Sequence, residues 1–294
     1  MSSNKEHTTK ILAGAGLILT TIIWGGAFVV MKNSVDLIPP SYLLALRFSI
    51  AAICMLAVFW PQNKGMDKKD LQYGVILGIF LFLSYIFQTY GLKYTTASKN
   101  AFITTLYVII VPFLHWAFNH QRPSGRNIGA AVLAVIGLAL LSLEGDMGIN
   151  LGDFLTLICG IFFAVHIVFI DRYTETHSPV RLTTVQMFTA AVLGWLLAPI
   201  ADGRLDFGIL NTSLVLGLLY LGIFSTMIGF FLQNVGQKYL SPNTSSILLS
   251  FESVFGLVFS VIFLGDPVTV KLLIGCAMMF GAVIISEYKP KKSK

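Results

Sequence analysis

The stretch "QTYGLKY", at residues 88–94, returns in modified form as "QNVGQKY" at residues 233–239. Four of the seven positions are identical, at an offset of 145 residues, and "LGIF" at 77–80 recurs at 221–224. Three earlier residues match at an offset of 139: Pro40, Ala51 and Ala52 correspond to Pro179, Ala190 and Ala191. The chain therefore consists of two related halves.

The composition places both halves in a membrane. Of 294 residues, 55% are hydrophobic and only 12% are charged, and the mean hydropathy is +0.79. Apolar segments long enough to cross a bilayer as helices recur along the whole chain. Ten such spans are predicted: 11–31, 42–60, 71–91, 96–118, 127–143, 151–170, 181–200, 212–235, 243–264 and 268–286. The links are short, so residues 1–294 form a single transmembrane domain in contact with the lipid bilayer.

The number of spans in each half determines how the halves are related. Residues 11–143 and residues 151–286 each contain five spans, and five is odd, so the second half enters the membrane from the opposite side. We therefore expect an all-α membrane protein with ten transmembrane helices as two inverted five-helix repeats. Inverted repeats are typical of transporters that work by alternating access around a site near the middle of the membrane.

The distribution of basic residues predicts the orientation. Of the 20 lysines and arginines, Arg47 lies inside a span, fourteen lie at the ends that share the side of the N-terminus, and five lie at the other side. The positive-inside rule therefore places both termini in the cytoplasm. These charges flank membrane spans and lack interleaved aromatic residues, so we expect lipid head groups and no nucleic acid as their partners.

Glu252 is the most informative residue of the apolar stretch "SSILLSFESVFGLVFS" at 245–260. A charge at the centre of a spanning helix costs about 2.5 to 3.5 kcal/mol, so such a residue usually faces a wet cavity or the bundle interior. It shares one helical face with Ser245, Leu249, Gly256 and Ser260, and the repeat partners of this face are Asn100, Thr104, Tyr107, Val111 and His115. We expect Glu252 to line a cavity between the halves. A structural hydrogen bond to a neighbouring helix is the alternative.

Other polar and aromatic residues lie well inside predicted spans. Gln88 and Gln233 are repeat partners and are expected at the rims of the cavity, with simple interhelical hydrogen bonding as the alternative. Arg47 lies near the outer end of its span, where a long side chain can snorkel to the interface, with a side chain that faces the substrate as the alternative. Four further residues would together give an apolar cavity with a few polar groups, although each could be an ordinary residue of a helix bundle: Trp24, Tyr85, Tyr107 and His166.

Small residues at helical spacing indicate close helix packing. Gly74 and Gly78 form a G-x-x-x-G pattern, and Ala277 and Gly281 form a similar pair. We interpret both as packing surfaces, because small residues allow helix backbones to approach closely in membranes.

Four segments resemble the EamA family of the drug/metabolite transporter superfamily: "IIWGGAFVVMK", "LRFSIAA", "GLKYTTAS" and "LSFESVFGLVFSVIFLGD". The resemblance implies a bacterial inner-membrane permease, often an exporter of amino acids or related metabolites. It also implies a cavity formed mainly by the first, third, fourth, sixth, eighth and ninth spans. The cavity residues that it implies here are Trp24, Tyr85, Gln88, Thr104, Tyr107, His166, Gln233 and Glu252.

Two prolines bear on how the halves would bend. Many family members have proline directly after the glutamate of the ninth span, where this chain has Ser253. In the fourth span, Pro112 can interrupt the backbone hydrogen bonds and provide a bend. The sequence therefore leaves open whether the two halves bend alike.

Three function classes follow from these patterns. A membrane enzyme is disfavoured because the five histidines show no metal-ligand spacing, and the lack of a P-loop argues against ATP-driven pumping. A receptor or structural protein would not require inverted halves. We expect a secondary transporter of a small-molecule substrate, with amino acids or with amphipathic or cationic drug-like compounds as cargo. Glu252 could also bind a proton. No cofactor or metal is expected, and the sequence does not determine the oligomeric state.

Overall fold

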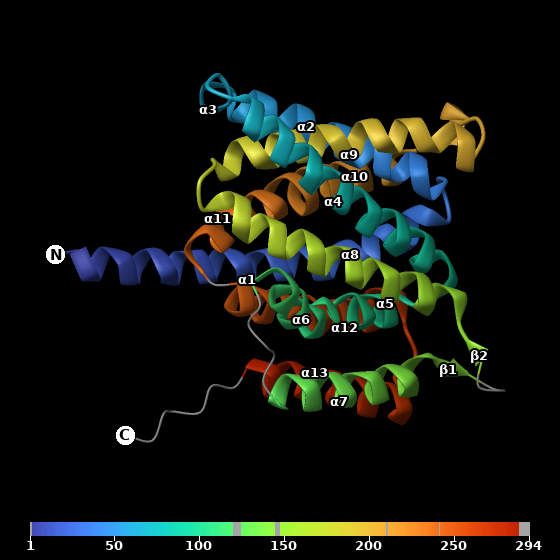
Figure 1. Ribbon diagram of the computed structural model, residues 1–294. Coiled ribbons are helices and arrows are strands. Elements are labelled where there is room, and N and C mark those ends of the chain that lie inside the picture. The colour runs from blue at the N-terminus through green and yellow to red at the C-terminus, as the bar shows by residue number, and fades with distance from the viewer. Residues whose placement is uncertain (1, 120–124, 145–147, 210, 241, 288–294) are drawn as a thin grey trace, which may run out of the picture.

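The computed structural model describes the chain except residues 1, 120–124, 145–147, 210, 241 and 288–294. Among the described residues, the helices of the first half are α1 (Ser2–Val35), α2 (Pro40–Val58), α3 (Trp60–Asn63), α4 (Lys68–Tyr94), α5 (Ala97–Thr104), α6 (Tyr107–Asn119) and α7 (Gly125–Ser142) (Figure 1). The short strands β1 (Leu143–Glu144) and β2 (Gly148–Ile149) pair antiparallel and connect the two halves.

The second half repeats this order. Its elements are α8 (Leu151–Thr174), α9 (Pro179–Ala201), η1 (Phe207–Ile209), α10 (Thr212–Leu219), η2 (Tyr220–Ile228), α11 (Gly229–Tyr239), α12 (Pro242–Leu264) and α13 (Val270–Glu287). The segment η2 is a π-helix, and it joins α10 to α11 in one continuous span.

The described residues confirm the all-α class. Eight helical segments are long and apolar enough to cross a membrane, and two shorter apolar stretches lie within α7 and α13, at Ile128–Gly137 and Val270–Ala282. Together they correspond to the ten predicted spans. Large apolar side chains cover the outside of the bundle, as a lipid environment requires, and Ile200 is 82% exposed.

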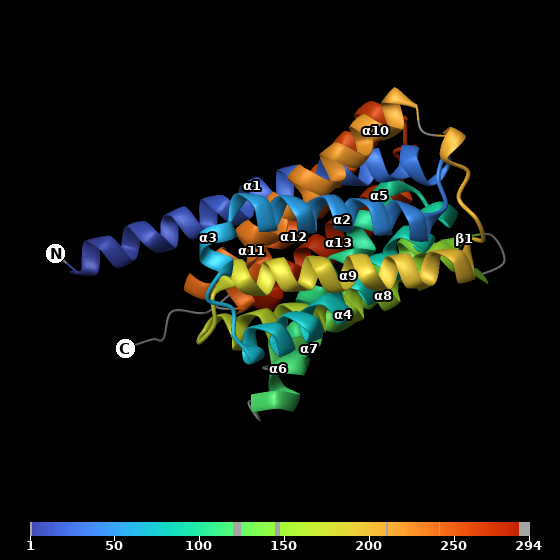
Figure 2. The ribbon, with the colours of Figure 1, turned by 90° about the horizontal axis from the view of Figure 1, so that it is seen from above.

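Helices of the first half pack directly against helices of the second half. The most extensive contacts include the pairs α1 with α12, α4 with α8, and α2 with α9, each of which joins one helix of the first half to one of the second. The helices run roughly along a common axis, and α1 projects beyond the bundle at its N-terminal end (Figures 1 and 2). The pair α7 and α13 lies at the side of the bundle (Figure 1), so the other eight spans surround the interior.

Small residues allow the closest helix contacts. A methyl group added at Gly78 would lie 2.5 Å from Cβ of Thr189 on α9, and one at Gly74 would lie 2.4 Å from Cβ of Val185. The packing interpretation of this pair is confirmed. The interpretation of Ala277 and Gly281 is wrong, because Ala277 is exposed and a methyl group at Gly281 would meet no described atom within 4 Å.

In the part of the chain that the structure describes, two spans are irregular, and they are not repeat partners. The fourth span breaks at Thr105 and Leu106, where the N–H of Leu106 bonds the carbonyl of Ile103 instead of continuing the α-helical pattern. Pro112 lies inside α6 and does not mark the break, so the sequence placed the irregularity too late. The π-helix η2 is the irregular segment of the second half. The two halves therefore bend differently.

Candidate functional site

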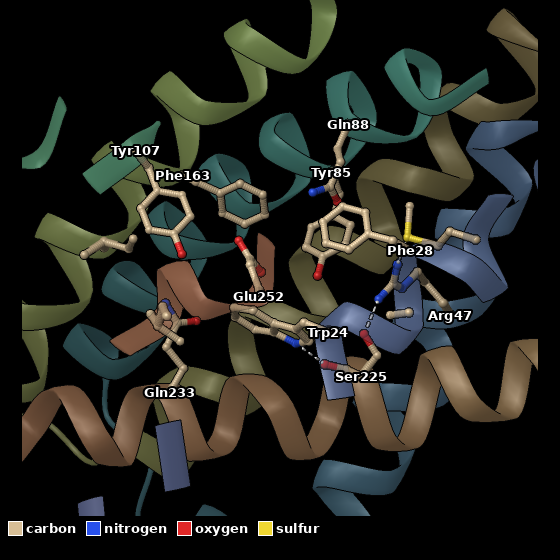
Figure 3. Close-up of a pocket in the computed structure, with 14 residues that line it drawn as sticks. Trp24, Phe28, Arg47, Tyr85, Gln88, Tyr107, Phe163, Ser225, Gln233 and Glu252 are labelled. Carbon is tan, nitrogen blue, oxygen red and sulfur yellow. Dashed lines mark hydrogen bonds between the residues drawn. The ribbon is translucent and has the colours of Figure 1, made fainter. Parts of the chain in front are cut away.

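Residues from both halves line a cavity inside the bundle (Figure 3). Its free volume is about 20 Å³, enough for about one ordered water molecule. Six spans contribute the residues that line it, together with α2: Trp24, Ala27, Phe28, Met31, Arg47, Tyr85, Gln88, Tyr107, Phe163, Ile167, Ser225, Gln233, Leu249 and Glu252. This free volume is too small for a molecule of metabolite size in this arrangement.

Glu252 is the acidic group of this cavity. The side chain extends from α12 and is 4% exposed, and it lies between Tyr107 and Tyr85 in Figure 3. Among the described residues, no lysine, arginine or histidine forms an ion pair with it. A buried carboxylate without a compensating charge is unfavourable, so this arrangement is typical of a site that receives a ligand.

Repeat partners meet at the cavity. Tyr107 corresponds to Glu252 and Gln88 corresponds to Gln233 at the offset of 145, and all four line the same space. The Tyr107 hydroxyl points toward Glu252 (Figure 3), yet it has no hydrogen-bond partner among the described residues, and neither does Oε1 of Gln233. Buried polar atoms are usually satisfied, so these two groups are available to a ligand or to water.

Arg47 also lines the cavity, which corrects the expectation that it snorkels to the interface. The residue is fully buried, and its Nε and Nη2 donate to the Thr226 hydroxyl at 3.0 and 2.8 Å. Nη2 also donates to the hydroxyl of Ser225 at 3.1 Å, and Nη1 contacts Sδ of Met31 at 3.1 Å. The guanidinium carbon lies 4.5 Å from the centre of the Tyr85 ring, a cation–π geometry.

The π-helix η2 positions the partners of Arg47. The hydroxyl of Thr226 donates to the carbonyl of Leu221, five residues earlier, and Nε1 of Trp24 donates to the carbonyl of Ser225 at 2.8 Å. A π-helix shifts the register of the backbone and frees carbonyl groups of this kind, often at functional sites. In the sequence, Ser225 and Thr226 directly follow the repeated "LGIF". Hydropathy alone does not distinguish these two hydroxyl residues from the rest of the span.

Aromatic rings form the walls of the cavity. Tyr85 contacts Phe163 edge to face, with ring centres 5.5 Å apart, and Trp24 lies 5.0 Å from Phe230. The apolar lining also includes Phe28 and Met31, which the sequence reading did not select. Such walls bind the hydrocarbon part of a small molecule, whereas the few polar groups orient it.

Three of the residues selected from the sequence lie beside the cavity lining. Thr104 accepts a hydrogen bond from Nε2 of Gln88 at 3.2 Å, so it supports a lining residue. Asn100 donates to the hydroxyl of Thr156 at 2.7 Å and thereby joins α5 to α8. Nε2 of His166 lies 2.8 Å from Oε1 of Gln186 and joins α8 to α9. The other seven selected residues line the cavity: Trp24, Tyr85, Gln88, Tyr107, Gln233, Leu249 and Glu252.

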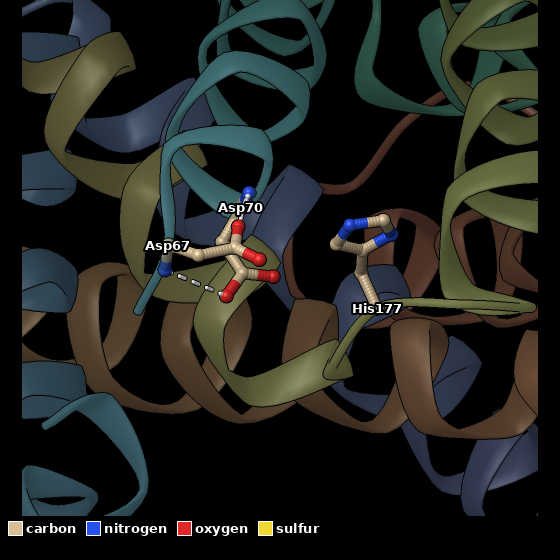
Figure 4. Close-up of side chains that lie close together, drawn as sticks. All are labelled: Asp67, Asp70 and His177. Carbon is tan, nitrogen blue, oxygen red and sulfur yellow. Dashed lines mark hydrogen bonds between the residues drawn. The ribbon is translucent and has the colours of Figure 1, made fainter. Parts of the chain in front are cut away.

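A second polar cluster lies where α4 begins (Figure 4). Oδ1 of Asp67 accepts from the N–H of Asp70 at 2.7 Å, and this hydrogen bond holds the pKa of the Asp67 carboxyl below its usual value. Oδ2 of Asp70 accepts from the N–H of Asp67 and pairs with Nη1 of Arg181 at 3.0 Å. Ligand atoms of Asp67, Asp70 and His177 lie within 4.8 Å of one another. Because both carboxylates cap α4 and Asp70 also holds α9 through Arg181, we assign this cluster a structural role.

Known proteins provide an independent comparison. The sequence profile of the EamA-like transporter family matches residues 12–143 and again residues 150–288. An uncharacterized transporter from Archaeoglobus fulgidus is 35% identical over 280 residues, which cover 95% of this chain and 87% of the relative. The uncharacterized transporter YoaV from Bacillus subtilis strain 168 is 20% identical over 292 residues, 95% of this chain and 98% of the relative.

A solved crystal structure supports the same fold. It matches with a TM-score of 0.69 and 18% sequence identity, and the match covers 92% of this chain and 95% of the other. The apolar helices of the described residues, the repeated halves of the sequence and a family match to each half agree with one another. The chain is a multi-pass membrane protein of the EamA-like transporter family.

Proposed function

We propose that this protein is a secondary transporter that moves small organic metabolites, of the size and kind of amino acids and related compounds, through the central cavity. The observation that carries this proposal is the position of Glu252, a buried carboxylate without an ion-pair partner among the described residues, in a cavity to which both halves contribute. A ligand that pairs with this group would offset the cost of burying it.

The size of the cavity is consistent with alternating access. A volume of about 20 Å³ holds no metabolite, so a substrate can enter only when the halves move apart on one side. In inverted repeats, the gate that closes one side and the gate that closes the other have related structures, so each half can adopt the arrangement of its partner. Family membership supports transport and a role other than catalysis.

The distribution of charges at the helix ends supports an orientation as well. The excess of basic residues on the side of both termini favours cytoplasmic termini and, for a bacterial cell, insertion in the inner membrane. The expected partners are the lipid bilayer, the small-molecule substrate and, in a coupled mechanism, protons.

A second candidate is an exporter of cationic or amphipathic drug-like compounds. The aromatic walls around Glu252 favour it, because aromatic faces and a carboxylate both attract organic cations. The presence of Arg47 in the same cavity argues against a ligand that carries only positive charge.

Flux measurements test transport itself. Purified protein in proteoliposomes should exchange a labelled substrate, first identified by comparing the metabolites of cells with and without the protein. Glu252→Gln should reduce this flux, whereas a conservative change at exposed Val192 on the outer surface of α9 should not. Absence of flux for every compound that accumulates differently between the two cell lines would contradict transport and favour a receptor or structural role.

A further inference from the structure

The central cavity contains one buried group of each charge. Arg47 reaches it from α2 and Glu252 reaches it from α12, and both are lining residues. No ion pair between them is found in the part of the chain that the structure describes, although a pair would offset the cost of burying each charge. Among the described residues, the cavity therefore holds two opposite charges that do not pair with each other.

The hydrogen bonds of Arg47 leave part of its guanidinium group weakly paired. Nε and Nη2 donate to hydroxyl oxygens of Ser225 and Thr226. Nη1, which carries two N–H donors, has the thioether sulfur of Met31 as its partner, and such a sulfur is a weak acceptor. A carboxylate is a much stronger partner for a guanidinium group, because it accepts charge-assisted and often bidentate hydrogen bonds.

The surroundings of Glu252 suit a positively charged ammonium group. An ammonium group has three N–H donors and no acceptor. Glu252 offers carboxylate oxygens, and the Tyr107 hydroxyl and Oε1 of Gln233 are buried acceptors without partners among the described residues. These three side chains could together satisfy one ammonium group.

Tyr85 lies between the two charged groups. Its ring centre is 4.5 Å from the guanidinium carbon of Arg47, and it lines the cavity together with Glu252. Figure 3 shows the rings of Tyr85 and Trp24 between the two charges. The region between the charges is therefore aromatic, which suits the hydrocarbon skeleton of a small molecule.

We propose that the cavity recognises a zwitterion, with Arg47 binding its carboxylate and the group formed by Glu252, Tyr107 and Gln233 binding its ammonium. This inference rests on the proposed transport function and assigns the charge pattern of the substrate. A zwitterion would neutralise both buried charges at once. A cation would leave Arg47 without a charged partner, and an anion would leave Glu252 in the same state, so the cavity selects molecules that carry both groups.

A binding panel on purified full-length protein tests the charge pattern. For leucine, phenylalanine, methionine and threonine, the free amino acid is compared with its amide, which lacks the carboxylate, and with its N-acetyl derivative, which lacks the ammonium. Tetraphenylphosphonium serves as a purely cationic amphiphile. We expect at least one amino acid to bind about tenfold or more tightly than both of its derivatives, because each loses a charge-assisted contact.

Two cavity variants should change this preference in opposite ways. Arg47→Gln should bind the amide about as well as the free amino acid, and Glu252→Gln should bind the N-acetyl derivative about as well. Arg47→Lys keeps the charge and should retain part of the preference for the carboxylate. Arg181→Gln is the matched control, because Arg181 pairs with Asp70 outside the cavity and its loss should leave the preference unchanged.

The outcomes separate this inference from transport. If Arg47 only holds the π-helix, Arg47→Gln should weaken all compounds equally, and that result would overturn the inference. Equal binding of the amides by the wild-type protein, or no binding of any of the four amino acids at millimolar concentration, would overturn it too, even if the cavity variants fail to fold. Flux of tetraphenylphosphonium without flux of amino acids would leave transport standing and reject the zwitterion. Binding of amino acids without flux of any compound would reject transport instead.

Discussion

Glu252 and Arg47 show how a single charged residue behaves in an apolar bundle. Each is almost fully buried, at 4% and 0% exposure, and each reaches the same cavity. Arg47 has hydroxyl partners on the π-helix, whereas the structure gives Glu252 no cationic partner among the described residues. Because an uncompensated carboxylate is unfavourable in this environment, Glu252 is the residue where a change of charge should have the clearest effect.

The substitution Glu252→Gln distinguishes two roles for this carboxylate. If Glu252 binds substrate and proton in turn, exchange without a pH gradient should survive, while accumulation driven by a pH gradient should be lost. If Glu252 only binds substrate, both activities should fall together, with binding weaker by about tenfold or more. Counterflow and gradient-driven uptake in proteoliposomes measure the two activities. A folded variant with normal transport and an unchanged pH profile would give Glu252 a purely structural role.

At the scale of the elements, the closest helix contacts and the irregular helical segments lie at different places in the bundle. The contact between α1 and α12 is very close, because a methyl group at Gly25 would lie 2.4 Å from Cβ of Phe255 and 2.9 Å from the backbone nitrogen of Gly256. The π-helix η2 and the break before α6 instead lie where the cavity is built. Tight contacts hold the helices together, and the irregular segments direct polar groups inward.

Gly25→Ala should therefore destabilise the protein by about 1 to 3 kcal/mol, because the added methyl group has no space and the helices must separate. The loss should appear as a lower melting temperature in detergent. Gly14→Ala on the same helix is the control, since its nearest neighbour would be Cδ1 of Leu248 at an ordinary 3.7 Å. Equal melting temperatures for the two variants would show that α1 and α12 do not depend on this contact.

At the scale of the whole molecule, inverted halves surround the central cavity. α1 begins at the end of the bundle where α13 finishes, and the pair of strands β1 and β2 lies at the opposite end (Figure 1). Helices from the two halves pack against each other throughout, so opening one side requires a rearrangement between the halves. Orientation and access are therefore properties of the complete bundle.

Reporter fusions test the orientation. The charge bias predicts that fusions after residues 64 and 292 report a cytoplasmic location and that a fusion after residue 146 reports an external one. Alkaline phosphatase is active outside and green fluorescent protein is fluorescent inside, so the two reporters should give complementary signals at each position. An external C-terminus would contradict the ten-span topology.

Cysteine accessibility tests whether the cavity opens. Thr104 and Leu249 are 1% and 0% exposed in this closed arrangement, so cysteines there should react with aqueous reagents only when one side opens. The background for these cysteines is a variant that lacks Cys54, Cys159 and Cys276. In this background, substrate should change the rate at which the introduced cysteines react. A cysteine at Leu77, which packs against Ile170 and Leu182, should stay protected. Protection at both test positions under every condition that supports transport would make these faces packing surfaces.

Local sequence by itself determined the helices, the repeat and the presence of a carboxylate, Glu252, inside an apolar span. Hydropathy over about 20 residues predicts a span because every backbone polar group must be satisfied within the segment, and an isolated carboxylate in such a segment is visible without any tertiary contact. The position of Arg47 was not visible, since its depth in the span suits both a snorkelling and an inward side chain. Only the packing of α2 against η2 decided between them, by placing Ser225 and Thr226 within reach. The position of His166 beside the cavity was also decided by tertiary packing, because its hydrogen bond to Gln186 depends on how α8 packs against α9. The periodicity of one helix predicts which residues share a face, but the neighbour that covers this face is selected by the free energy of the whole bundle.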